Sequence, residues 1–172
     1  MMHFLTWLEQ TGLSRWVSES PSLFAYPSIL FLHTAGLAFL VGPSIAISAR
    51  ILGFPTGLPL WPMEKFYPVM WWGFWINLAS GVVLLVADAT TKLTNWDFYV
   101  KLAFIGIAVI ALIMIRKRVF SHPSITDETF VPANAKTLAV VLLVCWAGAI
   151  TAGRLMAYLG PVAGGLGLKN KF

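Results

Sequence analysis

Charged residues are scarce in this chain. Lys, Arg, Asp and Glu make up only 11% of its 172 residues, whereas 58% are hydrophobic. A water-soluble surface needs roughly a quarter to a third of its residues charged, and here the few charges lie between long apolar runs. Together with a mean hydropathy of +0.78, this scarcity excludes a soluble globular protein and indicates that a lipid bilayer is its solvent.

Other absences exclude whole classes of site. The one cysteine, Cys145, cannot form an intrachain disulfide, a CxxC metal site or a covalent haem attachment. The sequence contains no Gly-rich phosphate loop, HExxH motif or nucleophile elbow, so no ordinary nucleotide-binding or hydrolase site is predicted. The net charge of +5 does not indicate a nucleic-acid partner, because the basic residues flank apolar runs and form no basic face interleaved with aromatics.

The chain does contain four apolar runs, each long enough to cross a bilayer as a helix. They predict an all-α, polytopic membrane protein: an up-down bundle of four transmembrane helices preceded by an amphipathic interfacial helix. We expect a surface helix over 1–20, a membrane domain over 21–160 and a flexible tail over 161–172. The expected spans are about 26–48, 66–87, 98–115 and 137–159.

The basic residues predict an orientation. Arg50 and Lys65 follow the first span, and the triplet 116–118 with Lys136 follows the third, on the same side of the membrane. Because Lys and Arg are enriched on the cytoplasmic side, we expect these loops to be cytoplasmic and both termini periplasmic. The expected location is a bacterial cytoplasmic (inner) membrane.

Small residues mark the faces through which the helices are expected to pack. Gly73, Asn77 and Gly81 recur every four residues and so share one face of the second span. The fourth span is rich in Ala and Gly between 147 and 153. In lipid, such small-residue faces allow close helix contact, which is equally compatible with packing inside the bundle and with assembly into a homo-oligomer or with other membrane subunits.

Up-down threading brings four ionisable residues to one membrane face: His33, Asp88, Lys101 and Arg154. An ionisable group that faces lipid costs on the order of 3 kcal/mol, so such side chains point inward, pair or reach water. With Asn77 deeper in the second span, they form the predicted ligand-binding site. Simpler interpretations remain open: an Asp88–Lys101 ion pair, Arg154 extended to the headgroups, and an interhelical hydrogen bond for His33.

His33 is the candidate metal ligand, because a histidine inside a span can ligate haem iron, bind a quinone carbonyl or carry a proton. The pattern fixes no cofactor, and haem b and a quinone are the candidates. A bis-histidine haem needs a second histidine, yet His3 lies in the surface helix and His122 on the opposite side. Met156 and Met70 are alternative sulfur ligands, although a membrane methionine is more often a packing residue.

Several strings resemble a family of uncharacterised bacterial four-helix membrane proteins. They are HTAGLAFLVG, ARILG, WWGFWINLASGVVLLVADA, Lys101 at the start of the third span, and AGRLMAYLG. The resemblance implies a compact four-helix bundle in which His33, Asp88, Lys101 and Arg154 match polar positions, and it implies no particular activity. The family pattern commonly has an acidic residue two positions before the arginine matched by Arg50, where this chain has Ser48. By architecture alone the chain is also loosely similar to four-helix b-type cytochromes.

These observations leave three hypotheses about function. The first is a redox or quinone/haem-interacting membrane subunit with a polar site in the outer half of the bundle. The second is a non-catalytic membrane subunit that serves the assembly of a larger complex or a homo-oligomer. The third, a small-solute or proton pathway, requires a polar stripe that continues inward beyond Asn77, and the sequence shows little to continue it. The pattern does not decide whether the protein is an enzyme.

Overall fold

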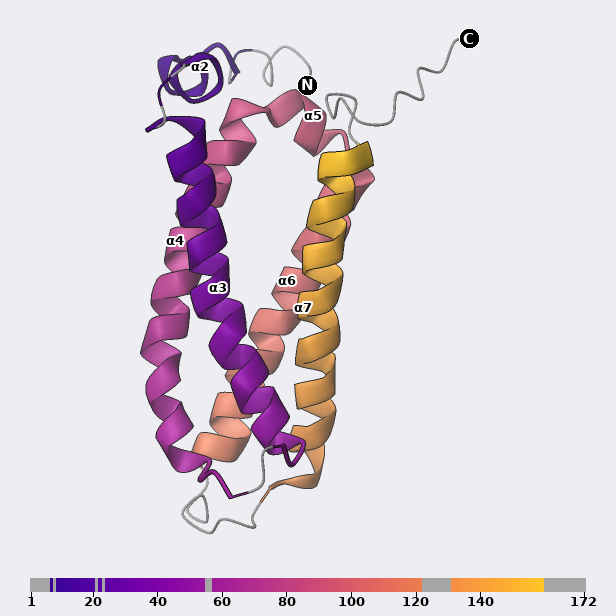
Figure 1. Cartoon of the computed structure of the whole chain (residues 1–172). Helices are drawn as coiled ribbons and strands as arrows, with labels where there is room; N and C mark the ends of the chain where they lie inside the picture. The colour runs from indigo at the N-terminus through magenta and orange to yellow at the C-terminus, as the bar shows by residue number, and fades with distance from the viewer. Residues whose placement is uncertain are drawn as a thin grey trace.

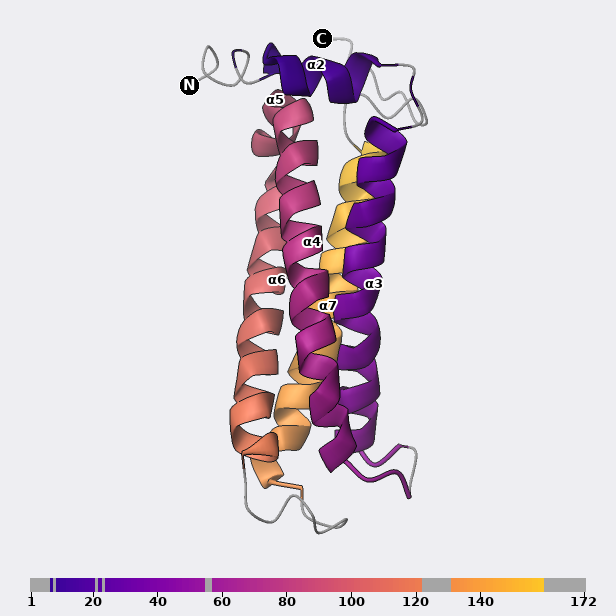
Figure 2. The same cartoon turned by 90° about the vertical axis from the view of Figure 1, so that its left-hand side faces the viewer.

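The structure, a computed structural model, describes residues 7, 9–20, 22, 24–54, 57–121 and 131–159. Four long helices run alternately up and down, with a short helix lying across one end (Figures 1 and 2). The long helices are α3 (Tyr26–Ile51), α4 (Phe66–Ala87), α6 (Trp96–Ile115) and α7 (Ala133–Leu159), and the short crossing helix is α2 (Gly12–Glu19).

The predicted fold class is confirmed. Four helical segments are long and apolar enough to cross a membrane, and the described residues contain no strand. The protein is therefore a multi-pass membrane protein. The helical segments that meet this criterion are Tyr26–Ile51, Trp61–Ala87, Trp96–Phe120 and Asn134–Met156.

Two of these segments extend beyond the apolar runs. The 3-10 turn η1 (Trp61–Lys65) leads into α4, and the π-helical turn η2 (Arg116–Phe120) continues α6 through the basic triplet. The triplet ends the apolar run without ending the helix, because a helix satisfies its own backbone hydrogen bonds in water and in lipid alike. The division into a surface helix, a membrane domain and a tail stays a prediction, and residues 1–6 and 160–172 lie outside the described part.

The four helices form two hairpins. α3 packs mainly on α4, α6 packs mainly on α7, and contact between α3 and α7 joins the hairpins. The apolar core lies mainly in the half of the bundle near η1 and η2. Its members on the long helices are Leu40, Val41, Ile47, Ile51, Tyr67, Met70, Ala108, Ala111, Leu112, Ile115, Ala135, Ala139, Leu142, Cys145, Trp146 and Ala149.

The other half of the bundle, near α2, is packed differently. All buried residues of α6 lie at or after Ala108, so the first half of this helix contributes no buried side chain. On α3 and α4 the buried residues of this half are Gly36, Ser80 and Leu84. Two of these three are small or polar, so the α2 end is less apolar inside than the opposite end.

α2 is fixed across the ends of α4 and the short helix α5 (Ala89–Leu93). Its Val17 is buried, the Ser14 hydroxyl donates to the Val86 carbonyl at 3.4 Å, and the Glu9 carboxylate accepts from the Thr90 backbone N–H at 2.7 Å. Trp16 remains half exposed. A helix perpendicular to the bundle with exposed tryptophan suits the headgroup region of a membrane.

Candidate functional site

The site is built on a very close crossing of α3 and α4 at Gly36 and Gly73. A Cβ added to Gly36 would lie 2.8 Å from the Asn77 nitrogen and from the Gly73 carbonyl oxygen. A Cβ added to Gly73 would lie 2.7 Å from the Gly36 carbonyl oxygen. These distances are shorter than any relaxed contact, and backbone atoms cannot move aside as a side chain can. The predicted packing face that contains Gly73, Asn77 and Gly81 is thus confirmed, and its partner is α3.

This crossing brings His33 and Asn77 into reciprocal contact. The Asn77 side-chain amide donates to the His33 backbone carbonyl at 2.7 Å. In return the His33 ring nitrogen Nδ1 lies 3.0 Å from the Asn77 backbone carbonyl and 3.2 Å from the Ser80 hydroxyl. The ring also packs over Gly81, where an added Cβ would lie 3.0 Å from Cε1. Each polar group of the pair therefore locks the position of the other.

These contacts select one tautomer of His33. A backbone carbonyl only accepts hydrogen bonds, so Nδ1 must carry the proton that it shares with the Asn77 oxygen. In the neutral ring, Nε2 then holds the lone pair. Within the described part of the chain, the hydrogen bonds of the ring use Nδ1 and leave Nε2 for a ligand. A histidine whose Nδ1–H is bound to a carbonyl is the usual arrangement when Nε2 binds a metal or accepts a proton.

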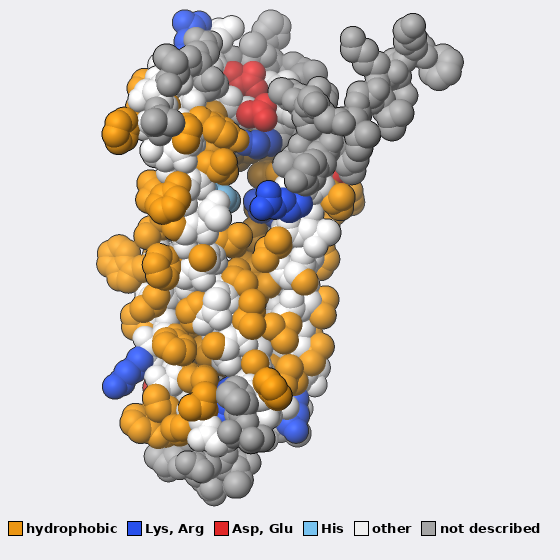
Figure 3. All heavy atoms as spheres, viewed as in Figure 1, with side chains coloured by type: hydrophobic (Ala, Val, Ile, Leu, Met, Phe, Trp, Pro, Cys, Tyr) orange, Lys and Arg blue, Asp and Glu red, His pale blue; other side chains and the backbone are white. Residues whose placement is uncertain are grey.

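Two lysines lie near the ring. The Lys101 side chain lies along α7 at Gly153. A Cβ added to Gly153 would lie 3.7 Å from Lys101 Cδ and 3.8 Å from Lys101 Nζ. The charges of Lys101 and Lys92 both act on His33. Figure 3 shows basic side chains and a histidine gathered on one face, toward the end of the bundle where α2 lies.

Asp88 lies with Lys92 at the turn between α4 and α5. It caps the end of α4, where its backbone N–H donates to the Leu85 carbonyl, and Lys92 Nζ donates to the Leu84 carbonyl at 2.6 Å. Burial lowers the pKa of Lys92, and the Asp88 charge opposes that shift. The one ion pair among the described side chains is Arg116–Glu64, at the other end of the bundle, so the Asp88–Lys101 pair considered from the sequence is not formed here.

The structure thus brings together part of the predicted site. His33 and Asn77 are in contact, Lys101 lies within electrostatic reach, and Asp88 is close to Lys92. Arg154 is exposed on α7 and forms no ion pair with another described residue. The sequence analysis missed Ser80 and Lys92. Both carried a usable signal, because Ser80 follows Asn77 by three residues and Lys92 follows Asp88 by four, spacings that place each pair on one helix face.

The described residues do not fit a bis-histidine haem. His33 is the one described histidine, since His3 and His122 lie outside the described residues. No group of three or more His, Cys, Asp and Glu side chains in the described part is arranged to hold a metal ion. Met70 is buried in the opposite half, with its sulfur 3.5 Å from the Ser44 hydroxyl, and cannot share a ligand with His33.

Comparisons with protein-family models, with curated proteins and with solved structures find no match to this chain. The fold therefore assigns the chain to a broad structural class, the four-helix multi-pass membrane proteins.

Proposed function

We propose that the protein is a membrane subunit that binds a quinol or quinone at the α2 end of its bundle, with His33 as the residue that contacts the head of the ligand. The observation that carries this proposal is the position of His33 Nδ1, 3.0 Å from the Asn77 carbonyl and 3.2 Å from the Ser80 hydroxyl. Because a carbonyl only accepts, Nδ1 carries the proton and Nε2 presents a lone pair, in the half of the bundle where α6 has no buried residue.

The chemistry follows from that lone pair. Neutral His33 accepts a hydrogen bond from a hydroxyl, which a quinol has and a quinone lacks. Lys101 and Lys92 supply donors and positive charge near the same ring, and such groups favour the carbonyl or anionic oxygen of the ligand. The reduced ligand is therefore expected to bind through His33 and the oxidised ligand more through the lysines.

Haem b is a weaker candidate for this site. It would need a second axial ligand, and the described residues offer Met156, partly buried near the end of α7, in place of a histidine. The resemblance to the uncharacterised bacterial four-helix family implies no activity, so it does not favour either ligand. The quinol proposal needs only groups that already lie around His33.

The test is ligand retention by His33→Ala. The full-length protein, purified from membranes in mild detergent, is extracted with solvent for mass spectrometry of quinones, and a short-chain ubiquinol is titrated against tryptophan fluorescence. We expect His33→Ala to weaken quinol binding about tenfold, because the partly buried acceptor of the ligand hydroxyl is lost.

Thr34→Ala is the matched control. Thr34 is the next residue of α3, is exposed, and donates only to the Leu30 carbonyl of its own helix at 2.9 Å. The Thr34→Ala variant should bind quinol as the unaltered protein does. Absence of any retained quinone together with no ubiquinol binding would refute the proposal, and equal weakening by both substitutions would remove His33 from it. A visible haem absorption band in the purified protein would favour haem instead.

A non-catalytic role in assembly is the second candidate, and it rests on the aromatic side chains that α4 exposes, such as Trp72 and Trp75, which are 72% and 58% exposed. The small-residue faces support it less than the sequence indicated. Gly36 and Gly73 are used between α3 and α4, while Gly148 of α7 packs on the Phe104 ring of α6. Recovery of a crosslinked partner or of a stable oligomer from membranes would support this role.

The proposed orientation puts α2 outside and η2 in the cytoplasm. Gln10→Cys and Ser121→Cys place a thiol at exposed positions on the two ends, and the native Cys145 is buried and should not react. With a membrane-impermeant maleimide on intact spheroplasts, we expect Gln10→Cys to be labelled and Ser121→Cys to be labelled only after lysis. The opposite pattern would reverse the orientation.

A further inference from the structure

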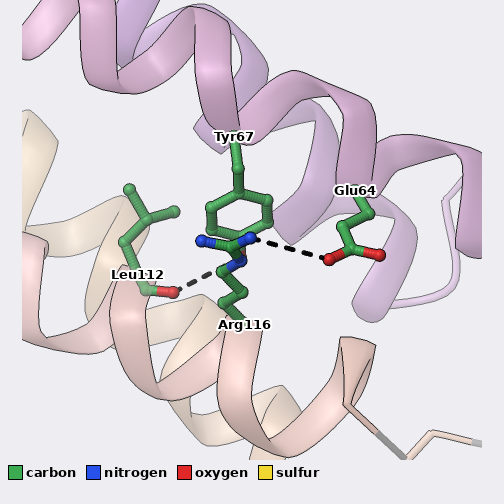
Figure 4. A network of polar contacts seen from close by, with 4 residues as sticks. All are labelled: Glu64, Tyr67, Leu112 and Arg116. Carbon is green, nitrogen blue, oxygen red and sulfur yellow. Dashed lines mark hydrogen bonds and ion pairs between the residues drawn. The ribbon is translucent and has the colours of Figure 1, made fainter.

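A second polar region lies at the other end of the bundle, between the start of α4 and the end of α6. Here the Arg116 guanidinium lies over the Tyr67 ring, 5.2 Å from its centroid, and 3.8 Å from the Glu64 carboxylate. The Tyr67 hydroxyl donates to the Leu112 carbonyl at 3.3 Å. Figure 4 shows these side chains converging from α4, η1, α6 and η2.

Beside this network is an open pocket of about 430 Å³. Arg116 and Lys117 contribute two positive charges to its lining against the single carboxylate of Glu64. Arg116 and Glu64 are each 49% exposed and lie 3.8 Å apart, so their attraction is weak. The pocket therefore keeps a net positive charge and donors that an anion can use.

The polarity of the residues that line the pocket changes along the membrane normal. α4 runs into the membrane, and Trp71 lies about 10 Å deeper than Glu64 at the rise of an α-helix. α6 runs outward, so Leu112 and Ile113 lie deeper than Lys117 and Ser121, and all four line the pocket. A basic, hydroxyl-bearing rim thus stands above an apolar and aromatic floor. This is the polarity of a phospholipid, with its phosphate at the surface and its acyl chains below.

We infer that this pocket binds the headgroup of an anionic phospholipid of the surrounding leaflet, with the phosphate at Arg116 and Lys117 and the acyl chains along Trp71 and Ile113. Basic pockets between membrane helices are known to select such lipids by charge. Glu64 competes with the phosphate for Arg116. Neither the orientation of the protein nor the His33 site enters this inference.

The experiment compares full-length protein in nanodiscs of phosphatidylcholine with and without phosphatidylglycerol, and counts retained lipids by native mass spectrometry. We expect preferential retention of phosphatidylglycerol. Lys117→Gln should lower its apparent affinity about fivefold, the effect of one interfacial charge. Glu64→Gln should raise the affinity, because the competing carboxylate is gone.

Arg118→Gln is the matched control, since Arg118 lies in the same turn η2, is exposed and does not line the pocket. It should retain phosphatidylglycerol like the unaltered protein. Equal loss with Lys117→Gln and Arg118→Gln would overturn the inference in favour of a diffuse surface charge. Retention of phosphatidylcholine and phosphatidylglycerol without preference would also overturn the inference. The same holds if inorganic phosphate alone binds as well as phosphatidylglycerol. Because Lys117 is exposed, its substitution is expected to leave the fold unchanged.

Discussion

Gly36→Ala is expected to destabilise the protein strongly. The added methyl group would lie 2.8 Å from the Asn77 nitrogen and the Gly73 carbonyl oxygen, both of which are backbone atoms of α4. α3 and α4 must then move apart, which also lengthens the hydrogen bonds between His33 and Asn77. We expect a loss of about 3 kcal/mol, the upper end for overpacking, or a fall in melting temperature of about 6–12 °C.

The measurement is thermal unfolding in detergent, followed by the fluorescence of the tryptophans. Gly106→Ala in α6 is the control, because nothing lies within 4 Å of a Cβ added to Gly106. Alanine favours a helix over glycine by about 1 kcal/mol, so this variant should melt at or above the unaltered protein. Equal behaviour of the two alanine variants would mean that α3 and α4 do not cross at Gly36.

Trp146→Ala is expected to cost the most of any single substitution in the core. Trp146 is 1% exposed and lies in the apolar core with Cys145 and Ala149 of the same helix. Removing a large buried aromatic ring leaves a cavity, which typically costs about 3–5 kcal/mol. In lipid this cost comes from lost packing, since hydrophobic transfer contributes little between helices.

Two further variants separate packing from other effects. The indole nitrogen of Trp146 has no hydrogen-bond partner among the described residues, so Trp146→Phe should recover most of the stability. Val144→Ala removes a side chain that is 58% exposed toward lipid and should change stability by less than about 0.5 kcal/mol. If Val144→Ala were as damaging as Trp146→Ala, the assigned inner face of α7 would be wrong.

Hydropathy was sufficient to predict the fold class, because apolar length determines whether a segment can cross a bilayer. The spacing of Gly73, Asn77 and Gly81 also predicted a packing face correctly, since four-residue spacing fixes a helix face whatever its partner. The identity of that partner was not predictable. Small residues on α7 indicated close packing equally well, and only the structure shows that Gly36 of α3 meets Gly73.

The predicted site was harder to derive, because depth along a helix does not fix direction around it. His33 and Arg154 were placed at similar depth, yet His33 faces Asn77 whereas Arg154 is exposed. The pocket at Arg116 was missed for a related reason. The basic triplet was interpreted as a cytoplasmic loop after the third span, but its helix continues, and this continuation turns Arg116 toward Tyr67. The role of His33 as a ligand-binding residue stays a prediction.

The pairing of α3 with α4 and of α6 with α7 has a consequence for biosynthesis. Both partners of the first hairpin leave the ribosome before α6 does, so the crossing at Gly36 and the His33–Asn77 contact need no later segment of the chain. α7 is synthesised after the other three long helices and must pack on both α6 and α3. Truncated nascent chains that end before α7 should therefore already contain the His33–Asn77 hairpin, while the apolar core that includes Trp146 forms only after α7 has been synthesised.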